Sequence, residues 1–337
     1  MREHAPGDGE VIVRRARPDE REAVVALAGE ALGWRPGEPN AELFAWKHDR
    51  NPFGPSPQWV AELDGRLVGF RTFLRWRFRE PEGDVVDAVR AVDTATHPDH
   101  QGRGVFRALT LRAVDELRDE GVGFVFNTPN DRSRPGYLKM GWREVGRVPL
   151  AVRPAGPSAL VRMVRARVPA AKWSLPCRVG EPAAAVFGGG GGDDRDLVEL
   201  LADQPPVTGL VTDRSPAFYA WRYSLDALAY RVVPVGASLR QGFAVFRLRA
   251  RGGAVECVLC DVVVPGGDRR VADRLVAAVA RRTRADYAIR VGRGTVTGAG
   301  FVRLPRQGPV LTWRALRHTT MPPLARWHLS LGDVELL

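Results

Sequence analysis

In the first 150 residues, the spacing of hydrophobic and polar positions is that of a strand in some segments and that of a helix in others. Strand-like patterns lie at residues 10–14, 58–63, 66–73, 88–96 and 123–126. Helical spacing of apolar positions lies at residues 18–32 and 105–120. The pair Asp64-Gly65 is typical of a tight hairpin turn between the second and third strands. Hairpin strands followed by a strand–helix–strand unit predict a mixed α/β sheet covered by helices.

The second half of the chain repeats several of these signals. Phe44-Ala-Trp-Lys is echoed by Tyr219-Ala-Trp-Arg, and Val92-Asp-Thr by Cys260-Asp-Val. A helical pattern at 271–282 then takes the place of the one at 105–120. We interpret this as a second copy of the same fold.

A connector rich in proline and glycine separates the two copies. It contains the glycine run 188–192 and a basic stretch, 160–172, which we interpret as an interdomain helix. The predicted organisation is therefore a first domain at 1–150, a connector at 151–205 and a second domain at 206–337.

Length and composition narrow the class of protein. The chain has 337 residues, which suits two domains, and its 45% hydrophobic and 26% charged residues exclude disordered and fibrous classes. No apolar run reaches the ~18 residues of a membrane span, and the N-terminus lacks the apolar core of a signal peptide. Three cysteines cannot form a disulfide framework. We expect a cytoplasmic protein that does not contact membranes.

The net charge of +11 belongs to one half of the chain. Residues 1–150 carry 23 basic and 24 acidic side chains, whereas residues 151–337 carry 27 and 15. The basic half could attract an acidic acceptor or partner, or simply be an arginine-rich solvated surface. Nucleic acid is the lesser explanation, because the charge is modest along the basic connector.

A glycine-rich loop, Gln101-Gly-Arg-Gly-Val-Phe, joins a predicted strand to a predicted helix. Backbone N–H groups at such a helix start can hold phosphate oxygens, and glycines allow close approach. The spacing differs from the glycine patterns of dinucleotide folds and of nucleotide P-loops. From the loop alone, a phosphate site and a plain tight turn are both open.

The surrounding residues resemble a known family. The segment His97-Pro-Asp-His-Gln-Gly-Arg-Gly-Val-Phe-Arg-Ala-Leu resembles the acetyl-CoA loop of the GCN5-related N-acetyltransferase (GNAT) superfamily. Asn130, Ser133, Tyr137 and Gly141-Trp142 follow in the spacing of that superfamily's closing segment. The resemblance covers most of residues 10–148. It implies a mixed α/β sheet and, with the repeat, two tandem GNAT-like domains.

The resemblance implies an acetyl-CoA cosubstrate, no metal and a set of cofactor contacts. Backbone groups of one strand end would pair with the pantetheine arm, and loop amides would hold the pyrophosphate. Asn130 and Ser133 would lie near the arm, or serve only as helix caps. One departure is Phe106, where the family has glycine or alanine; we expect its ring to point away from the pyrophosphate. The implied contacts are Thr94, Ala95 and Thr96 on the strand, and Gln101, Gly102, Arg103, Gly104, Val105 and Phe106 in the loop.

Two side chains are candidates for the chemistry of acyl transfer. Tyr137 matches the family tyrosine proposed to protonate the leaving thiolate, and its alternative role is packing. In a regular strand, Asp93 would lie on the same face as Val89, Ala91 and Ala95, which are apolar. We therefore expect partial desolvation to raise its pKa toward that of a general base. The alternative is a carboxylate tied to backbone or to an arginine.

Other proton acceptors are open as well. His97 and His100 have suitable ordinary pKa values, although both flank the loop and are expected at the surface. The C-terminal carboxylate of Leu337 and a chain of water molecules are further candidates.

The second copy lacks the features of a cofactor site. At the place of the loop it has Pro265-Gly-Gly-Asp, in which Asp268 would repel phosphate, and no tyrosine precedes Gly300-Phe301. We interpret it as a degenerate copy. Cys257 and Cys260 lie three residues apart on a predicted core strand, so their thiols should face opposite sides and form no metal site.

The function implied by the resemblance is N-acetyl transfer from acetyl-CoA to a primary amine of a small molecule or peptide, by direct attack in a ternary complex. Two alternatives stay open: a CoA-binding regulatory or scaffolding protein with little catalysis, and a longer-chain acyl or aminoacyl transferase. The degenerate copy would either wall the acceptor pocket or mediate assembly, for example into a homo-oligomer.

Overall fold

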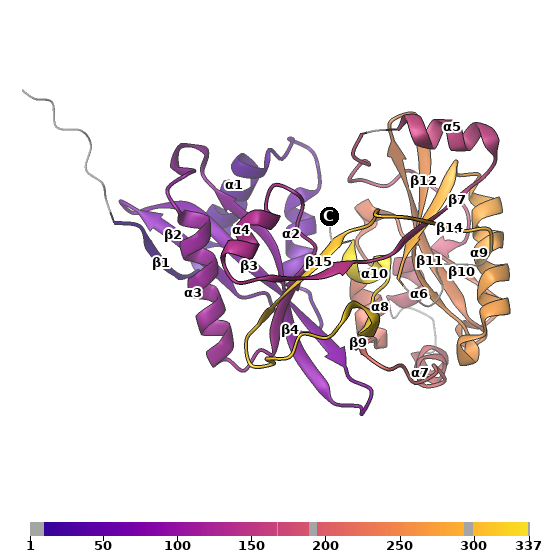
Figure 1. Ribbon diagram of the computed structural model, residues 1–337. Helices are drawn as coiled ribbons and strands as arrows, with labels where there is room; N and C mark the ends of the chain where they lie inside the picture. Colours follow the sequence, from indigo (N-terminus) through magenta and orange to yellow (C-terminus); the bar gives the residue numbers. More distant parts are fainter. Residues whose placement is uncertain (1–9, 167, 189–193, 293–298, 336–337) are drawn as a thin grey trace, which may run out of the picture. The chain divides into compact units, whose positions relative to one another are not determined.

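The computed structural model describes residues 10–166, 168–188, 194–292 and 299–335, which divide into two compact units (Figure 1). Unit 1 contains residues 1–77, 86–144 and 312–321. Unit 2 contains residues 78–85, 145–311 and 322–337. Each unit is a mixed sheet carrying helices, which confirms the predicted fold class.

Unit 1 is built on a sheet in which β1, β2, β3, β4, β5, β15 and β6 lie side by side in that order. The predicted turn pair closes the β2–β3 hairpin, with Asp64 at φ 50° and Gly65 at φ 77°. β4 and β5 are parallel, as the strand–helix–strand pattern requires. The strand bounds are β1 (Ile12–Arg15), β2 (Gln58–Leu63), β3 (Arg66–Arg79), β4 (Val85–Thr96), β5 (Phe124–Asn127), β6 (Arg143–Arg147) and β15 (Val310–Ala315).

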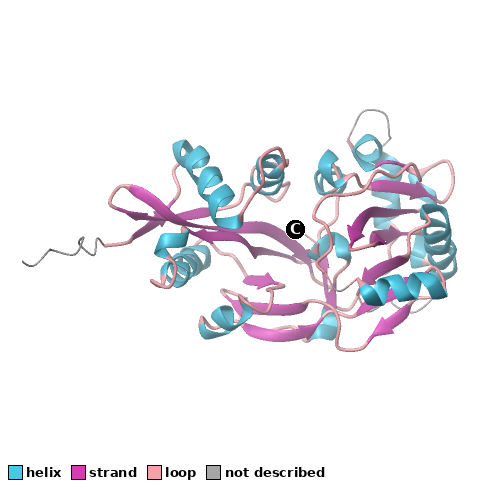
Figure 2. Cartoon of the chain, turned by 90° about the horizontal axis from the view of Figure 1, so that it is seen from above, coloured by secondary structure: helices cyan, strands magenta, loops and turns pink. Residues whose placement is uncertain are grey.

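Helices cover both faces of the unit 1 sheet (Figure 2). α1 and α2 pack on one face, where Leu27 and Phe44 meet Phe70 of β3. α3 packs on the other face, where Leu109 and Leu117 join a core with the sheet. The bounds are η1 (Pro18–Glu20), α1 (Arg21–Leu32), α2 (Asn40–His48), η2 (Pro98–His100), α3 (Val105–Asp119) and α4 (Arg134–Lys139).

Unit 2 repeats this plan on a second sheet, in the order β14, β7, β13, β12, β11, β10 and β8. α9 covers one face and has the same length as α3. Its strand bounds are β7 (Leu150–Pro154), β8 (Glu181–Pro182), β10 (Arg231–Pro234), β11 (Phe243–Arg251), β12 (Ala254–Val263), β13 (Tyr287–Val291) and β14 (Val302–Leu304). The short strands β9 (Leu210–Thr212) and β16 (Trp327–His328) pair with each other, and β9 also pairs with the end of β3, so both belong to the first sheet. The helix bounds are α5 (Pro157–Arg165), α6 (Ala183–Phe187), α7 (Asp194–Ala202), α8 (Pro216–Arg222), η3 (Asp226–Leu228), η4 (Leu239–Gln241), η5 (Pro265–Gly267), α9 (Arg269–Thr283), η6 (Leu324–Arg326) and α10 (Leu331–Val334).

Two strands lie in a different unit from the strand that directly precedes them in the sequence. β7 directly follows β6 in sequence, but it pairs with β13 and β14 in unit 2. β15 follows β14, but Thr312–Ala315 pair with β5 in unit 1. Compact units and sequence halves are therefore not the same segments.

Three expectations about particular segments can be compared with the described residues. The basic stretch forms a helix only as α5, ending at Arg165, and the glycine run from residue 189 lies outside the described residues. Cys257 and Cys260 are buried on β12, and the described part of the chain contains no cluster of three metal-ligating side chains. No described helix is long and apolar enough to cross a bilayer.

Candidate active site

Two parallel strands separate at the centre of unit 1. β4 and β5 pair from Ala88–Phe124 to Arg90–Phe126, and β4 then continues to Thr96 without further pairing to β5 among the described residues. Thr94, Ala95 and Thr96 lie on this unpaired part. Because β3 pairs with the other edge of β4, the backbone groups that face away from β3 are the ones available to an extended ligand lying in the opening.

The glycine-rich loop lies at the end of the same strand. Gly102 and Gly104 both have positive φ, 78° and 79°, and a Cβ atom at either would meet no other atom within 4 Å. Glycine is needed here for its backbone conformation, not for space. Gln101 to Gly104 are exposed, and the side-chain amide nitrogen of Gln101 (Nε2) donates a long hydrogen bond of 3.4 Å to the Thr96 carbonyl.

The helix that follows the loop starts without a side-chain cap. Gly104 is the N-cap of α3, and no described side chain accepts hydrogen bonds from the first turn, which begins at Val105. These N–H groups carry the positive end of the helix dipole. The loop amides from Gln101 to Phe106, with Arg103 exposed among them, fit a pyrophosphate group.

Tyr137 lies on α4, close to the start of α3. Its ring is 4% exposed and packs edge-on against Phe106, with centroids 5.6 Å apart, and against Trp142 at 5.1 Å. Phe106 therefore points toward α4 and the core, as we expected for the bulky residue in the loop. The same packing fixes the position of the tyrosine.

Sequence reasoning missed Arg71, which lies beneath these rings on β3. The side chain is fully buried, and its guanidinium carbon lies 5.3 Å from the Tyr137 ring centroid and 4.7 Å from that of Phe73. None of its three guanidinium nitrogens has a hydrogen-bond partner among the described residues. A buried charge of this kind is costly unless a partner arrives. In the sequence, the signal was an arginine between Phe70 and Phe73, in a strand that carries four further arginines.

Asp93 lies on the opposite face of the sheet, in contact with α2. Its Oδ2 atom forms an ion pair with Lys47 and lies 2.8 Å from Nε2 of His48. These two contacts hold the pKa of Asp93 below its usual range, although burial of the carboxyl opposes them. Burial lowers the pKa of His48, so its ring is neutral and Nε2–H donates to the carboxylate.

The expected rise in the pKa of Asp93 is therefore wrong in direction. Asp93 has φ 38°, and this left-handed residue breaks the alternation of β4. Ala91 consequently belongs to the core under α3, whereas Ala95 belongs to the core under α1 and α2. Asp93 faces a lysine and a histidine instead of an apolar set. The signal for this was the basic pair after Trp46, which sequence reasoning treated only as part of the repeat.

The remaining predicted residues lie around the loop and α4. Asn130 lies in the turn before α4, whose N-cap position is Ser133: its Oδ1 accepts hydrogen bonds from the N–H groups of Arg132 and Ser133 and from the Ser133 hydroxyl. His97 contacts Glu30 (3.1 Å) and stacks edge-on with His100 near the surface. Leu337 lies outside the described residues.

In unit 2, the chain's own residues occupy both the start of the corresponding helix and the opening between the corresponding strands. The Asp268 carboxylate accepts hydrogen bonds from the N–H groups of Arg270 and Val271 at the start of α9. β12 and β13 also stop pairing, after Val258–Ile289. A side chain at Gly332 would clash with Asp261 on β12, and one at Gly292 with the Leu329 carbonyl. The C-terminal segment thus fills the opening between these strands.

Comparison with known proteins agrees with this geometry. Residues 12–145 match the model of the acetyltransferase (GNAT) domain family. The L-amino acid N-acyltransferase MnaT of Escherichia coli is 36% identical over 78 residues, 23% of this chain and 42% of that protein. The mycothiol acetyltransferase of Thermomonospora curvata is 36% identical over 83 residues, 25% of each protein. The alignments thus span less than half of these relatives.

Several solved structures resemble the chain over most of its length. One of them is a probable N-acyltransferase from Enterococcus faecalis, with a TM-score of 0.62 and 12% identity, matched over 92% of this chain and 73% of that one. At this identity the likeness concerns the fold alone. Residues 12–145 thus match the GNAT acetyltransferase domain family, and a second unit with a sheet of the same strand arrangement follows them.

Proposed function

We propose that this protein transfers an acetyl group from acetyl-CoA to a primary amine at the site in unit 1. The observation that carries the proposal is the opening between β4 and β5 beside an exposed, uncapped helix start with two left-handed glycines. The arm of an acyl-CoA fits the unpaired strand Thr94–Thr96, and its pyrophosphate fits the loop amides. Bound acetyl-CoA would supply the activated acyl group.

Tyr137 is the proposed acid. A phenol held between Phe106 and Trp142 cannot drift, so a hydrogen bond to the departing sulfur costs little reorganisation. Arg71 supports this role, because its positive charge beneath the ring favours the negative charge that develops on the leaving group.

We propose that the Asp93 carboxylate supplies a negative charge where the acceptor amine binds. With a lowered pKa it is ionised at neutral pH and is a weak proton acceptor. Its side chain is 17% exposed, whereas Lys47 is 3% exposed and His48 is fully buried. We infer that it attracts the ammonium form of the amine, and that water takes the proton.

The test is an assay of CoA release by full-length protein with acetyl-CoA and a panel of amines. The panel should include L-amino acids, because one relative is named as an L-amino acid N-acyltransferase, together with simple amines and short peptides. We expect amine-dependent thiol release. Tight acetyl-CoA binding without turnover on any amine would instead favour a CoA-binding regulatory protein.

A further inference from the structure

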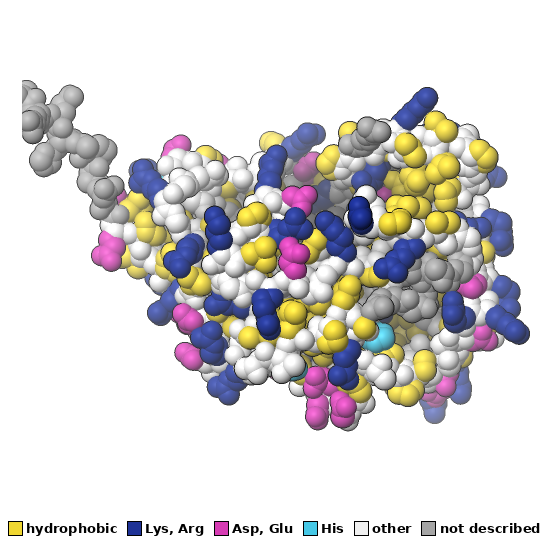
Figure 3. All heavy atoms as spheres, viewed as in Figure 1, with side chains coloured by type: hydrophobic (Ala, Val, Ile, Leu, Met, Phe, Trp, Pro, Cys, Tyr) yellow, Lys and Arg dark blue, Asp and Glu magenta, His cyan; other side chains and the backbone are white. Residues whose placement is uncertain are grey.

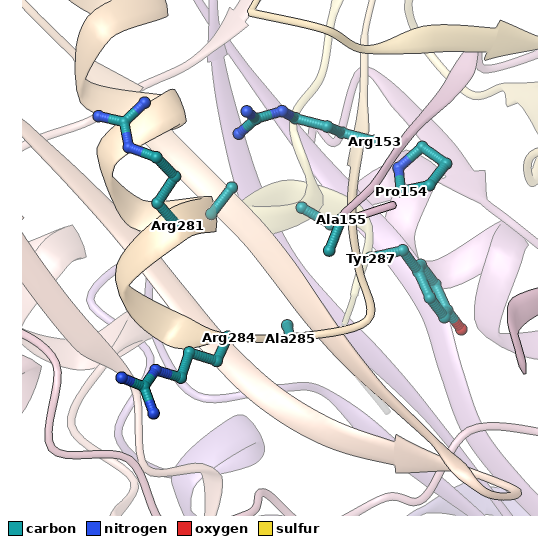
Figure 4. Close-up of a pocket in the computed structure, with 9 residues that line it drawn as sticks. Arg153, Pro154, Ala155, Arg281, Arg284, Ala285 and Tyr287 are labelled. Carbon is teal, nitrogen blue, oxygen red and sulfur yellow. The ribbon is translucent and has the colours of Figure 1, made fainter. Parts of the chain in front are cut away.

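The basic half of the chain contains a pocket that has no part in the proposed acyl transfer. It lies within unit 2, has a volume of about 360 Å³, and is lined by Arg153 of β7 with Arg281 and Arg284 at the end of α9 (Figure 4). Four alanines, a proline and Tyr287 make up the rest of its wall. No aspartate or glutamate is among these lining residues.

Arg153 and Arg281, which both line the pocket, come from different elements. In Figure 4 the guanidinium of Arg153 extends from β7 toward α9, where Arg281 begins, while Arg284 points away from both. Nη1 of Arg153 is buried and has no hydrogen-bond partner among the described residues. Burial, and then the charge of Arg281, lower the pKa of Arg153. Two like charges thus face one pocket, an arrangement that an anion would relieve.

Neighbouring carboxylates do not neutralise this pair. Asp286 bonds with Arg162 at 2.6 Å and accepts from the Val255 N–H at 2.7 Å. Glu256 bonds with Arg249 at 2.5 Å and with Arg251 at 3.2 Å. Both acids therefore already have basic partners of their own.

The end of α9 explains only part of the arrangement. A helix C-terminus carries about half a negative charge and favours basic residues such as Arg281 and Arg284 in its last turn. It does not account for Arg153, which belongs to a strand and is half-buried beside Arg281. The positive charge also exceeds what the helix end can balance.

On the face that Figure 3 shows, Lys and Arg side chains are spread among hydrophobic and other residues. A pocket with two guanidinium groups and alanine walls suits a small ligand better than a polyanion.

We propose that this pocket binds a small molecule that carries a phosphate or carboxylate group. The anion lies between Arg153 and Arg281, whose planar guanidinium groups match the oxygens of either group. The alanine and proline wall takes a compact apolar part of the ligand. The site is independent of the acyl-transfer site in unit 1.

The test is calorimetric titration of the full chain, in a low-salt Tris buffer, with inorganic phosphate, phenyl phosphate and benzoate. We expect saturable binding of at least one anion, weakened by added salt. Tighter binding of phenyl phosphate than benzoate identifies a phosphorylated ligand, and the reverse order a carboxylated one. Phenyl phosphate should also bind more tightly than inorganic phosphate.

Arg281→Gln should raise the Kd about tenfold or more, and Arg153→Gln should act in the same way. Arg282→Gln is the matched control, because Arg282 is exposed on the same helix but does not line the pocket. Arg281 is exposed too, so its variant should fold normally. The proposal is overturned if no anion binds saturably, or if Arg282→Gln weakens binding as much as Arg281→Gln.

Discussion

His48 and Asp93 form a hydrogen bond of 2.8 Å between a helix and the strand beside it, and unit 2 repeats the contact with Tyr223 and Asp261. In both units the ring comes two residues after a tryptophan of the repeated motif. The Asp93 side chain is 17% exposed, whereas that of Asp261 is 1% exposed. The same framework is therefore open to a ligand in one copy and closed in the other.

Replacing Asp93 by asparagine should destabilise unit 1 and slow acetyl transfer. The ammonium of Lys47, which is 3% exposed, would lose this carboxylate, and breaking a buried ion pair costs roughly 3–5 kcal/mol. Urea unfolding measures the change. Adding Lys47→Met to Asp93→Asn should restore much of the stability but not the activity. Equal stability of Asp93→Asn and the natural protein would contradict this account.

Replacing Tyr137 by phenylalanine should lower kcat about 100-fold and change the Kd for acetyl-CoA little. The ring keeps its packing against Phe106 and Trp142, so only the hydroxyl is lost. Stopped-flow or steady-state CoA release gives kcat, and calorimetry gives the Kd. Tyr219→Phe is a matched control, because the buried Tyr219 hydroxyl has no hydrogen-bond partner among the described residues. Undiminished turnover by Tyr137→Phe would remove the tyrosine from the mechanism.

Replacing Arg71 by methionine should lower kcat while leaving stability equal or higher. The change removes a buried guanidinium without a described partner and keeps most of the side-chain volume. Thermal unfolding and the assay of CoA release together test this. Arg222→Met should behave in the opposite way, because Arg222 donates to Gly332, Tyr230 and Glu335 at 2.7–2.8 Å. A large loss of stability in Arg71→Met would indicate a structural role.

Replacing Gly104 by alanine should weaken acetyl-CoA binding more than it weakens the fold. An alanine at φ 79° costs about 1 kcal/mol, and the resulting shift of the backbone would misalign the loop amides. Gly37→Ala controls for the strain, since Gly37 has φ 82° and equally open surroundings. Calorimetry should show weaker binding only for Gly104→Ala. Equal affinities in the two variants would place the pyrophosphate elsewhere.

The stability of unit 1 should depend on Glu20 at acid pH. Hydrogen bonds from Arg14, with help from Arg17, lower the pKa of Glu20 from 4.5 to about 2. Because the folded value is the lower one, the contribution is complete above pH ~4.5 and is lost as the pH falls through about 2. Glu20→Gln should thus cost up to about 3 kcal/mol at pH 7 and almost nothing at pH 2, by denaturant unfolding. A constant difference across this range would contradict the linkage.

Local patterns were sufficient to predict most elements of unit 1. The Asp64-Gly65 turn and the spacing of apolar residues along α3 depend on neighbours in the chain, so they can be read directly. The contacts of Asp93 could not be predicted from the sequence, because a single left-handed residue reverses the side on which the next residues lie. Arg71 was missed for a related reason: its importance depends on the absence of a partner, which only packing reveals.

The strands β7 and β15 limit where the chain can be cut into separate proteins. A protein ended at residue 205 would lack β15, so β5 and β6 would lose the strand that separates them. The isolated second half would likewise lack β7 between β13 and β14. The exposed edges that remain are templates for aggregation. Each sheet is thus completed by a strand from the other side of residue 205, so neither part is expected to fold stably without the other.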